Sequence, residues 1–344
     1  MSLDTEFHVE RTYHPEPMLV QVRVDDGPCT LIDPRALDLH PLGDALSRAG
    51  AEGTVLVLHA ADADLRLLAR IAGLVPGEVF DTQLAAALVG EGWPTRLQTL
   101  CARITGERLA KRETLSDWSR RPLDPAQVTY AEDDVRVLPA IEEGLRARLD
   151  AAGRLAPFRA LMAERVEEWI APARDDDAWR ALGASARVDP EERAALRSLA
   201  AWRERVARER DWTRGTVLGD AHLVDLARRR PDTLAALRDN RRFPGSVIKR
   251  DGEAILAAIA DAAAAPPPEA PRPWPSAWAE VLRASVRAAA PGVAPELVWD
   301  DVALARAHAG EVPTGWRAEL LGAEGRAFAA GARALTVDGR LVAV

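Results

Sequence analysis

Acidic side chains lie at the edges of apolar segments in three distant parts of the sequence. Asp4 and Glu6 stand two residues apart, and Asp64 follows an apolar run. Asp134 stands four residues after Tyr130. Hard divalent cations prefer carboxylate oxygens, and two cations ~4 Å apart need several carboxylates to balance their charge. The four acids therefore predict a site for two divalent cations, Mg²⁺ or Mn²⁺.

Such a site is suited to phosphodiester hydrolysis. One cation lowers the pKa of a bound water, and the second stabilises the departing 3′ oxygen during in-line attack on the last phosphodiester. Tyrosine has an ordinary pKa near ~10, so we expect Tyr130 to orient the water rather than to deprotonate it fully. The predicted metal ligands are Asp4, Glu6, Asp64 and Asp134, and Tyr130 completes the predicted catalytic set.

Three expected elements carry these residues. On a strand over 3–7, Asp4 and Glu6 project from the same face and can grip one cation together. Asp64 opens a helix just after a buried strand, where backbone N–H groups and the positive end of the helix dipole favour an anionic ligand or phosphate. Tyr130 and Asp134 are i and i+4 on a helix and share one face.

The remaining periodicity predicts an α/β layer fold. Short turns separate the first three strands, which we expect to be antiparallel neighbours, and later strands alternate with helices. This order implies a mixed sheet of five strands. The expected strands are 3–7, 18–24, 29–32, 54–58 and 79–81. The expected helices are 37–49, 62–72, one that ends at 88, and a long one over 125–151. Asp124 is the expected N-cap of the long helix.

Composition sets broader limits. A chain of 344 residues with 48% hydrophobic content can form two or three globular domains. Cys29 and Cys101 form no CxxC motif, which argues against a disulfide framework or a zinc knuckle and fits a reducing cytosol. No apolar stretch reaches the ~18 residues of a membrane span, and no secretory leader is evident. We expect a cytoplasmic protein, a monomer by preference, with no membrane partner.

The net charge of -8 argues mildly against a nucleic-acid partner. The distribution is less negative between residues 191 and 265, where 15 Lys and Arg stand against 12 Asp and Glu. Almost all the positive charge is arginine, which suits bidentate phosphate contacts. A genome rich in G and C explains the same bias, and we favour that explanation.

Pattern changes divide the chain. We expect an α/β domain over 1–172 that carries the four acids, a linker over 173–190 in which Trp179 packs, and a helical domain over 191–265. A Pro-rich spacer follows over 266–273 and separates a second helical domain over 274–344. In the first helical domain, helices are expected over 191–210, 222–229, 233–237, 244–249 and 251–264.

Beyond the acids, several blocks occur in an order that resembles the ribonuclease D family, a tyrosine-containing branch of the DEDD 3′-to-5′ exonucleases. The blocks are 3–7, 12–15, 31–34, 59–60 with 64–65, 81–83, and 117–118 before 121–123. Residues 199–203 and 207–211 resemble the opening helix of an HRDC domain, and 315–320 resemble the end of that family's second, divergent copy.

The resemblance implies a ribonuclease H-like (DnaQ-like) fold followed by all-α HRDC domains. It also implies processing of RNA 3′ ends, tRNA precursors above all, with RNA carrying a free 3′ end as the partner. Family members usually carry a helix and half a strand before the Asp4 block, whereas only three residues precede Asp4 here. Either the start was trimmed or assigned late, or a short or frayed first strand gives Asp4 and Glu6 less support, with weaker metal binding as the consequence.

Further candidates belong to nucleic-acid binding. Trp212 could stack on a base and Arg214 could bind phosphate, as in single-strand binders, although a tryptophan that caps the helical core fits equally well. A phosphate-tracking patch is slightly favoured over ordinary surface charge. Its members are Arg238, Arg241, Arg242, Lys249 and Arg250. His59 is more readily explained as a structural residue at a strand end.

Two alternatives to an exoribonuclease stay open. One is a 3′-to-5′ DNA exonuclease, because no residue in the predicted site evidently selects a 2′-hydroxyl, and single-stranded DNA would then be a partner. The other is a catalytically silent nucleic-acid-binding or repair adaptor that uses its helical domains.

Basic residues are also expected near the rim of the predicted metal site. They are Lys111, Arg112, Arg120 and Arg121.

Overall fold

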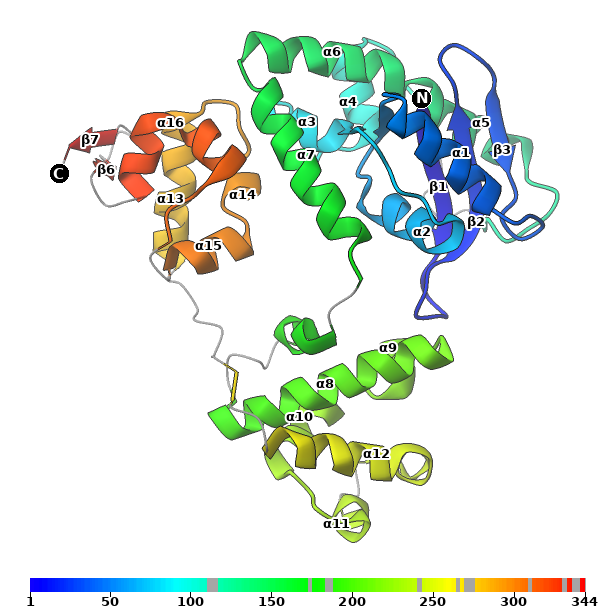
Figure 1. The fold of residues 1–344 in the computed structure, drawn as a ribbon, viewed down its shortest axis with the longest axis vertical. Coiled ribbons are helices and arrows are strands. Elements are labelled where there is room, and N and C mark those ends of the chain that lie inside the picture. Colours follow the sequence, from blue (N-terminus) through cyan, green and yellow to red (C-terminus); the bar gives the residue numbers. More distant parts are fainter. Residues whose placement is uncertain are drawn as a thin grey trace. The chain divides into compact units, whose positions relative to one another are not determined.

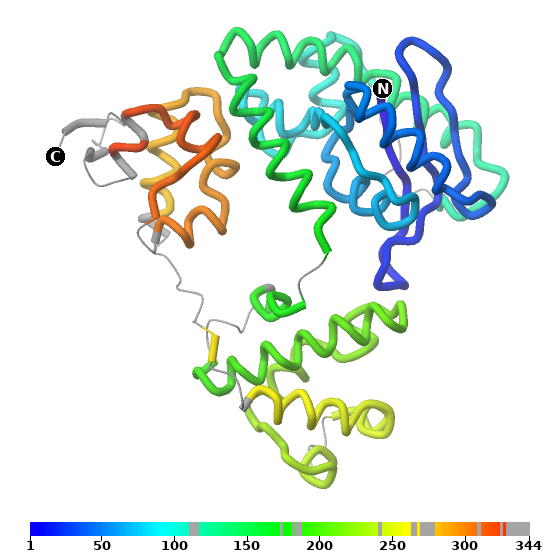
Figure 2. Tube along the Cα trace, in the orientation of Figure 1, coloured from blue at the N-terminus to red at the C-terminus, as the bar shows by residue number. Residues whose placement is uncertain are grey.

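The computed structural model describes most of the chain. The described residues are 1–109, 117–172, 175–182, 188–239, 243–263, 267–268, 276–308, 311–329, 333–335 and 341–343, and the rest are grey in Figure 2. Contacts divide the chain into two compact units. The first unit contains residues 1–7, 17–171 and 274–344, and the second contains residues 8–16 and 172–273.

The first unit is built on a five-stranded mixed sheet in the order β3-β2-β1-β4-β5 (Figure 1). β2 and β3 are antiparallel, whereas β4 is parallel to both β1 and β5. The mixed five-stranded sheet expected from the sequence is therefore confirmed. Its strands are β1 (Ser2–His8), β2 (Glu16–Arg23), β3 (Cys29–Ile32), β4 (Leu56–Leu58) and β5 (Val79–Asp81).

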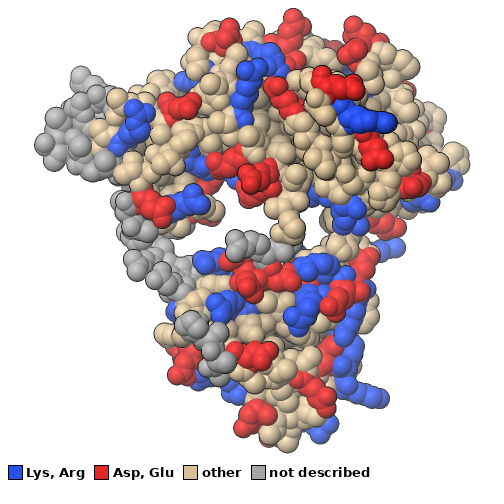
Figure 3. Space-filling view, in the orientation of Figure 1, with Lys and Arg blue, Asp and Glu red and all other residues tan. Residues whose placement is uncertain are grey.

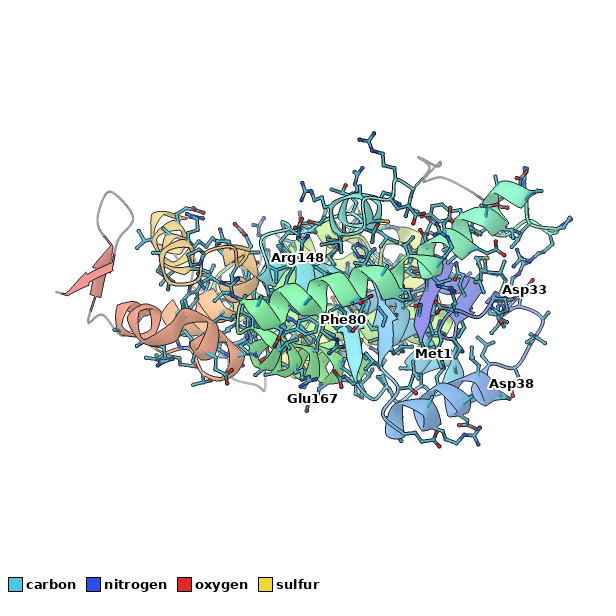
Figure 4. All side chains as sticks on the ribbon, turned by 90° about the horizontal axis from the view of Figure 1, so that it is seen from above. Met1, Asp33, Asp38, Phe80, Arg148 and Glu167 are labelled. Carbon is cyan, nitrogen blue, oxygen red and sulfur yellow. The ribbon has the colours of Figure 1, made fainter. Side chains whose placement is uncertain are left out.

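Helices cover this sheet and bury its apolar side chains. α7 packs against both α2 and β5, and Phe80 of β5, labelled in Figure 4, lies 4.8 Å from Phe158 of α7 between ring centroids. Gly43 in α1 allows a close approach to α2, because a Cβ there would meet the Ala72 carbonyl oxygen at 1.8 Å. The helices are α1 (His40–Ala51), α2 (Asp62–Ala72), α3 (Thr82–Leu88), α4 (Leu97–Ile104), α5 (Pro125–Arg136), α6 (Leu138–Ala151) and α7 (Leu155–Ile170).

The expected long helix over 125–151 is wrong in one respect. The segment forms two helices, α5 and α6, which meet at Val137. Pro139 stands in the first turn of α6, where its missing N–H costs nothing and its ring prevents continuation of the preceding helix. The start of α5 agrees with expectation, because Asp124 and Gln127 form a reciprocal capping box.

Four helices after residue 274 complete the first unit. They are α13 (Ser276–Ala289), α14 (Pro295–Val298), α15 (Asp301–His308) and α16 (Gly315–Ala329). Their buried side chains continue the apolar core of the sheet domain, and the Ala294 N–H donates to the Ala87 carbonyl at 2.7 Å. The sequence predicted only helices here, but β6 (Arg333–Leu335) pairs with β7 (Leu341–Ala343) in a small antiparallel ladder.

The second unit is a helical bundle around α8. Its helices are α8 (Pro190–Arg210), α9 (Arg214–Val217), α10 (Asp220–Arg229), α11 (Leu234–Asp239) and α12 (Gly245–Ala263). The two helices expected over 244–264 are thus one. Within the expected linker, Asp175–Ala181 forms a 3₁₀ helix that packs on α8, and Trp179 is buried as expected.

None of the helices in the described ranges is long and apolar enough to cross a membrane. Cys29 and Cys101 are both free thiols.

Candidate active site and nucleic-acid interface

Strand β1 carries two of the predicted metal ligands. Leu3 and Thr5 are buried, and the alternating Asp4 and Glu6 are half-buried on the opposite face. The expectation of a short or frayed first strand is wrong, because β1 is seven residues long. Its start is paired to β4: the Val57 N–H donates to the Met1 carbonyl at 2.9 Å.

Asp64 comes to the site in the first turn of α2, directly after β4. Gly73 ends this helix in a left-handed conformation, and Asp62 and Asp64 complement the positive end of its dipole. Only 6% of Asp64 is exposed. The Thr5 hydroxyl donates to the Asp64 carboxylate, so the strand and the helix are joined beside the acids.

Helix α5 supplies the remaining two residues. Asp134 is buried beside Ala131, and the Tyr130 side chain lies near enough to interact with its carboxylate. The Tyr130 ring packs in a small cluster with Trp118, at 6.1 Å between ring centroids, and with Met18 of β2. The side chains at i and i+4 share a face as the helical spacing predicts.

Three of the four acids converge closely. Carboxylate oxygens of Asp4, Glu6 and Asp134 all lie within 4.8 Å of one another. Asp64 is close enough to Asp4 that its charge is the largest electrostatic influence on that residue. The structure therefore brings together every acid that the sequence predicts as a metal ligand, and adds Tyr130 beside them.

Burial raises the pKa of every acid in this cluster, and the charges of the other cluster acids add to the rise for Asp4 and Glu6. Burial is the main cause of the rise in the pKa of Glu6 to about 8, with the charges of Asp134 and Asp64 adding to it. Burial also raises the pKa of Asp64 and of Asp134 to about 7. The pKa of Asp4 rises well above its usual range for the same reasons. Burial beside these acids also raises the pKa of Tyr130.

The donor set fits divalent cations. Within the described ranges, none of the four acids forms an ion pair with arginine or lysine, so their charge is unbalanced by protein. Oxygen ligands in this number suit Mg²⁺ or Mn²⁺. A cation placed among Asp4, Glu6 and Asp134 would offset the repulsion that adds to the raised pKa of Asp4 and of Glu6.

Neighbouring polar residues have structural contacts. The Asp81 carboxylate accepts from the N–H groups of Gln83 and Leu84 and so caps α3. His59 contacts the Thr82 hydroxyl through Nδ1 at 2.8 Å. Its position agrees with the expected structural histidine at a strand end.

The basic residues expected at the rim of the site differ in their contacts. Arg121 donates to the Met18 and Trp118 carbonyls and pairs with Asp33, labelled in Figure 4, at 2.5 Å. It therefore holds the segment before α5. Arg120 is exposed and pairs with Asp117. Lys111 and Arg112 lie outside the described residues.

Sequence reasoning missed two residues that support the site. Thr5 lies between two predicted ligands, and only the fold reveals that its hydroxyl faces Asp64. Trp118 belongs to a block that the family resemblance identified, but its contact with Tyr130 depends on tertiary packing. In the sequence, the available signal for Thr5 was a hydroxyl side chain between the two acids of one strand.

The candidates for nucleic-acid binding occupy different environments. Trp212 is half-buried against the core of the second unit, with the guanidinium carbons of Arg250 and Arg210 at 5.0 and 5.4 Å from its ring. This contact supports the core-capping alternative. Arg250 also pairs with Asp251. Arg214 donates to Glu204 at 2.6 Å.

The other members of the predicted basic patch are exposed or lie outside the described residues. Lys249 and Arg238 are exposed on α12 and α11. Arg241 and Arg242 lie outside the described residues. Figure 3 shows basic and acidic side chains interspersed on the visible face of the second unit. The visible face therefore presents mixed charge rather than a single basic surface.

Comparison with known proteins agrees with this geometry. Residues 1–150 match the family model described as 3′-5′ exonuclease, and residues 192–259 match the HRDC domain. Ribonuclease D of Acidiphilium cryptum is 35% identical over 369 residues, which cover 100% of this chain and 91% of that protein. Ribonuclease D of Jannaschia sp. is also 35% identical, with 100% and 93% covered.

A solved structure gives the same result. Escherichia coli RNase D, described as an exoribonuclease involved in structured RNA processing, superposes with a TM-score of 0.78 at 28% identity, covering 93% of this chain and 90% of that one. Fold and site together define a 3′-to-5′ exonuclease with a ribonuclease H-like domain and an HRDC region. The chain belongs to the ribonuclease D family of 3′-to-5′ exoribonucleases.

Proposed function

We propose that this protein trims RNA 3′ ends by two-metal phosphodiester hydrolysis. The convergence of the Asp4, Glu6 and Asp134 oxygens within 4.8 Å, with Asp64 beside them, is the observation that carries the proposal. Asp4, Glu6, Asp64 and Asp134 would hold two Mg²⁺ or Mn²⁺ ions. When bound, the cations would lower the pKa of the attacking water and stabilise the charge that develops on the departing 3′ oxygen.

Residues of this chain position the reaction. Tyr130 keeps its proton, because burial and the neighbouring charge of Asp134 raise the pKa of its hydroxyl. A neutral hydroxyl at this point can orient a water molecule but does not act as a strong base. Trp118 holds the Tyr130 ring through packing, and the buried Thr5 hydroxyl orients the Asp64 carboxylate. The catalytic residues are thus Asp4, Glu6, Asp64, Tyr130 and Asp134.

The substrate we propose is RNA with a free 3′ end, with tRNA precursors and other structured RNAs as the main class. The description of the Escherichia coli relative as an exoribonuclease involved in structured RNA processing supports this choice. Encounter with such RNA would occur in the cytoplasm, with the protein as a monomer.

We propose five domain segments for this task. They are an exonuclease domain over 1–172, a linker over 173–190, an HRDC domain over 191–265, a spacer over 266–273 and a divergent second HRDC-like domain over 274–344. The HRDC domain would contact RNA through Arg214, Arg241, Arg242, Lys249 and Arg250, whereas Trp212 caps its core. Arginine and lysine on helices suit phosphate contacts that are independent of sequence.

Hydrolysis of single-stranded DNA is the second candidate activity. The proposed metal ligands address phosphates, and no described side chain in the cluster is evidently placed to read a 2′-hydroxyl. The adaptor alternative receives no support from the site, because an adaptor has no need for four converging acids, two of them buried.

A substrate comparison tests the proposal. The purified chain would receive 5′-labelled RNA and DNA of identical sequence, and a tRNA with a 3′ extension, in Mg²⁺ or Mn²⁺. We expect stepwise loss of the RNA 3′ end, a stop near the structured part of the tRNA, and slower loss of DNA. Equal or faster shortening of DNA would favour the DNA exonuclease instead.

A further inference from the structure

A single buried carboxylate joins the ends of two neighbouring strands in the first unit. Asp81 ends β5 and is paired with Leu58, which ends the parallel strand β4. Only 1% of Asp81 is exposed. Because the two strands are parallel, helices α2 and α3, labelled in Figure 1, start beyond the same end of the sheet. The proposed metal ligand Asp64 lies on α2, whereas Asp81 is not among the proposed ligands.

Four backbone N–H groups donate to the Asp81 carboxylate. Two of them belong to the first turn of α3, where the N–H groups of Gln83 and Leu84 donate to Oδ1 at 2.7 and 3.2 Å. The other two belong to the loop that leads into α2. There the Ala60 N–H donates to Oδ1 at 3.2 Å, and the Ala61 N–H donates to Oδ2 at 2.8 Å. Asp81 therefore holds the start of α2 as well as capping its own helix.

The loop at Ala60 has a conformation that needs such support. Ala60 has a φ of 59°, in the left-handed region, and Ala61 returns to right-handed angles. A side chain disfavours the left-handed conformation, so a residue other than glycine keeps it only where the surroundings hold it. Successive N–H groups around such a residue form a concave nest for an anion. Here the Asp81 carboxylate occupies that nest.

The support extends from this loop to Asp64. The Ala61 carbonyl accepts from the Leu65 N–H at 3.0 Å in the first turn of α2, and Leu65 is fully buried. Asp64 directly precedes Leu65, and its carboxylate accepts from the Thr5 hydroxyl. Asp64 is thus held at its backbone through Ala61 and at its side chain through Thr5. The charge of Asp81 also adds to the raised pKa of Asp64, so the two carboxylates lie near each other.

We propose that Asp81 is a positioning residue that fixes the loop at Ala60 and Ala61 and thereby sets Asp64 in place before a divalent cation binds. An ionised carboxylate has about four acceptor sites, and the four N–H donors occupy this number, so Asp81 supports the backbone rather than a cation. Replacing a residue that orients a metal ligand typically lowers metal affinity about 10- to 100-fold. The inference rests on the metal-dependent function proposed above.

Asp81→Asn removes one acceptor oxygen at nearly constant shape. When the amide oxygen takes the Oδ1 position, the NH₂ group faces the Ala61 N–H, and two donors confront each other. We expect the Mn²⁺ affinity of the full chain, measured by calorimetric titration, to fall about thirtyfold. Asp189→Asn is the matched control, because Asp189 caps α8 in the second unit and accepts from the Glu192 N–H at 2.7 Å. This control should bind Mn²⁺ like the parent.

A second substitution tests the route through Ala60. Glycine adopts the left-handed conformation without steric cost, so Ala60→Gly should make the loop less dependent on Asp81. Alone, this substitution should leave Mn²⁺ affinity like that of the parent. Combined with Asp81→Asn, it should recover about fivefold of the lost affinity. Glycine at this position would not reverse general damage to the fold.

Hydrogen exchange of residues 59–65 in the metal-free parent measures the support without activity, and it decides the matter even if Asp81→Asn does not fold. We expect slow exchange of the Ala60 and Ala61 amides in the parent and faster exchange in Asp81→Asn.

Four results would overturn the role of Asp81. They are fast exchange of this loop in the parent, parent-like Mn²⁺ affinity in Asp81→Asn, an equal loss of affinity in Asp189→Asn, and no recovery in the double variant. If the parent bound no Mn²⁺, the proposed function would fail, while exchange would still report whether Asp81 holds the loop.

Discussion

The Thr5 hydroxyl donates to the Asp64 carboxylate and so joins β1 to α2 inside the acidic cluster. Thr5 is buried between the two acids of its strand. A hydrogen bond of this kind orients a metal ligand before the cation arrives. The geometry of Asp64 therefore depends on a side chain that has no place in the coordination sphere itself.

Replacement of Thr5 by valine tests this dependence. Valine keeps the shape and removes the donor, so we predict about tenfold weaker Mn²⁺ binding, the lower end for loss of a residue that orients a ligand. Calorimetric titration of the purified chain measures it. Thr5→Ser keeps the hydroxyl and should bind Mn²⁺ like the parent, and equal affinities in all three proteins would refute the role of Thr5.

Metal binding should release protons. The pKa of Glu6 is raised to about 8 and that of Asp134 to about 7, so both acids hold protons in part at neutral pH without a cation. A cation needs the ionised forms, so its affinity should fall as pH drops from ~8 to ~6. Titration in two buffers with different heats of ionisation measures the release. Identical heats in both buffers would contradict raised pKa values.

Tyr130→Phe should separate chemistry from metal binding. The phenyl ring keeps the packing against Trp118 and loses the hydroxyl beside Asp134. We predict a fall in kcat of about a hundredfold, the lower end for a side chain positioned at the reacting group, with Mn²⁺ affinity nearly unchanged. Single-turnover digestion and calorimetry on the same preparation provide both values. A large loss of metal affinity would mean that Tyr130 mainly supports the ligands.

The carboxyl-terminal helices should unfold together with the sheet domain. Trp316 is 2% exposed, and its Nε1 donates to Glu164 of α7 at 2.9 Å. Trp316→Ala should cost about 3–5 kcal/mol and lower the melting temperature of one shared transition. Calorimetric unfolding measures it, with Val302→Ala as the control because Val302 is 63% exposed. Two separate transitions in the parent, one insensitive to Trp316, would contradict a common core.

The sequence was sufficient for the parts of the fold that local pattern controls. Alternation placed Asp4 and Glu6 on one strand face, and i, i+4 spacing placed Tyr130 with Asp134. The predicted helix over 125–151 failed because Pro139, which is tolerated in a first turn, was assigned to a helix interior.

Contacts between distant segments could not be predicted in this way. Nothing local indicates that Tyr13 packs on Glu204, 191 residues later, or that Trp118 lies on Tyr130. The two roles left open for Trp212, base stacking and capping of the core, illustrate the same limit, because the arginines of α8 and α12 reach its ring only through the tertiary fold.

The most direct test of the metal-centred account is digestion of 5′-labelled single-stranded RNA by the parent chain and by Asp134→Ala, with Mg²⁺ or Mn²⁺ and with a chelator. The account predicts a ladder that shortens from the 3′ end with the parent and is absent both in the variant and with the chelator. A ladder that persists in Asp134→Ala, or no ladder from a parent chain that binds the metal, would contradict it.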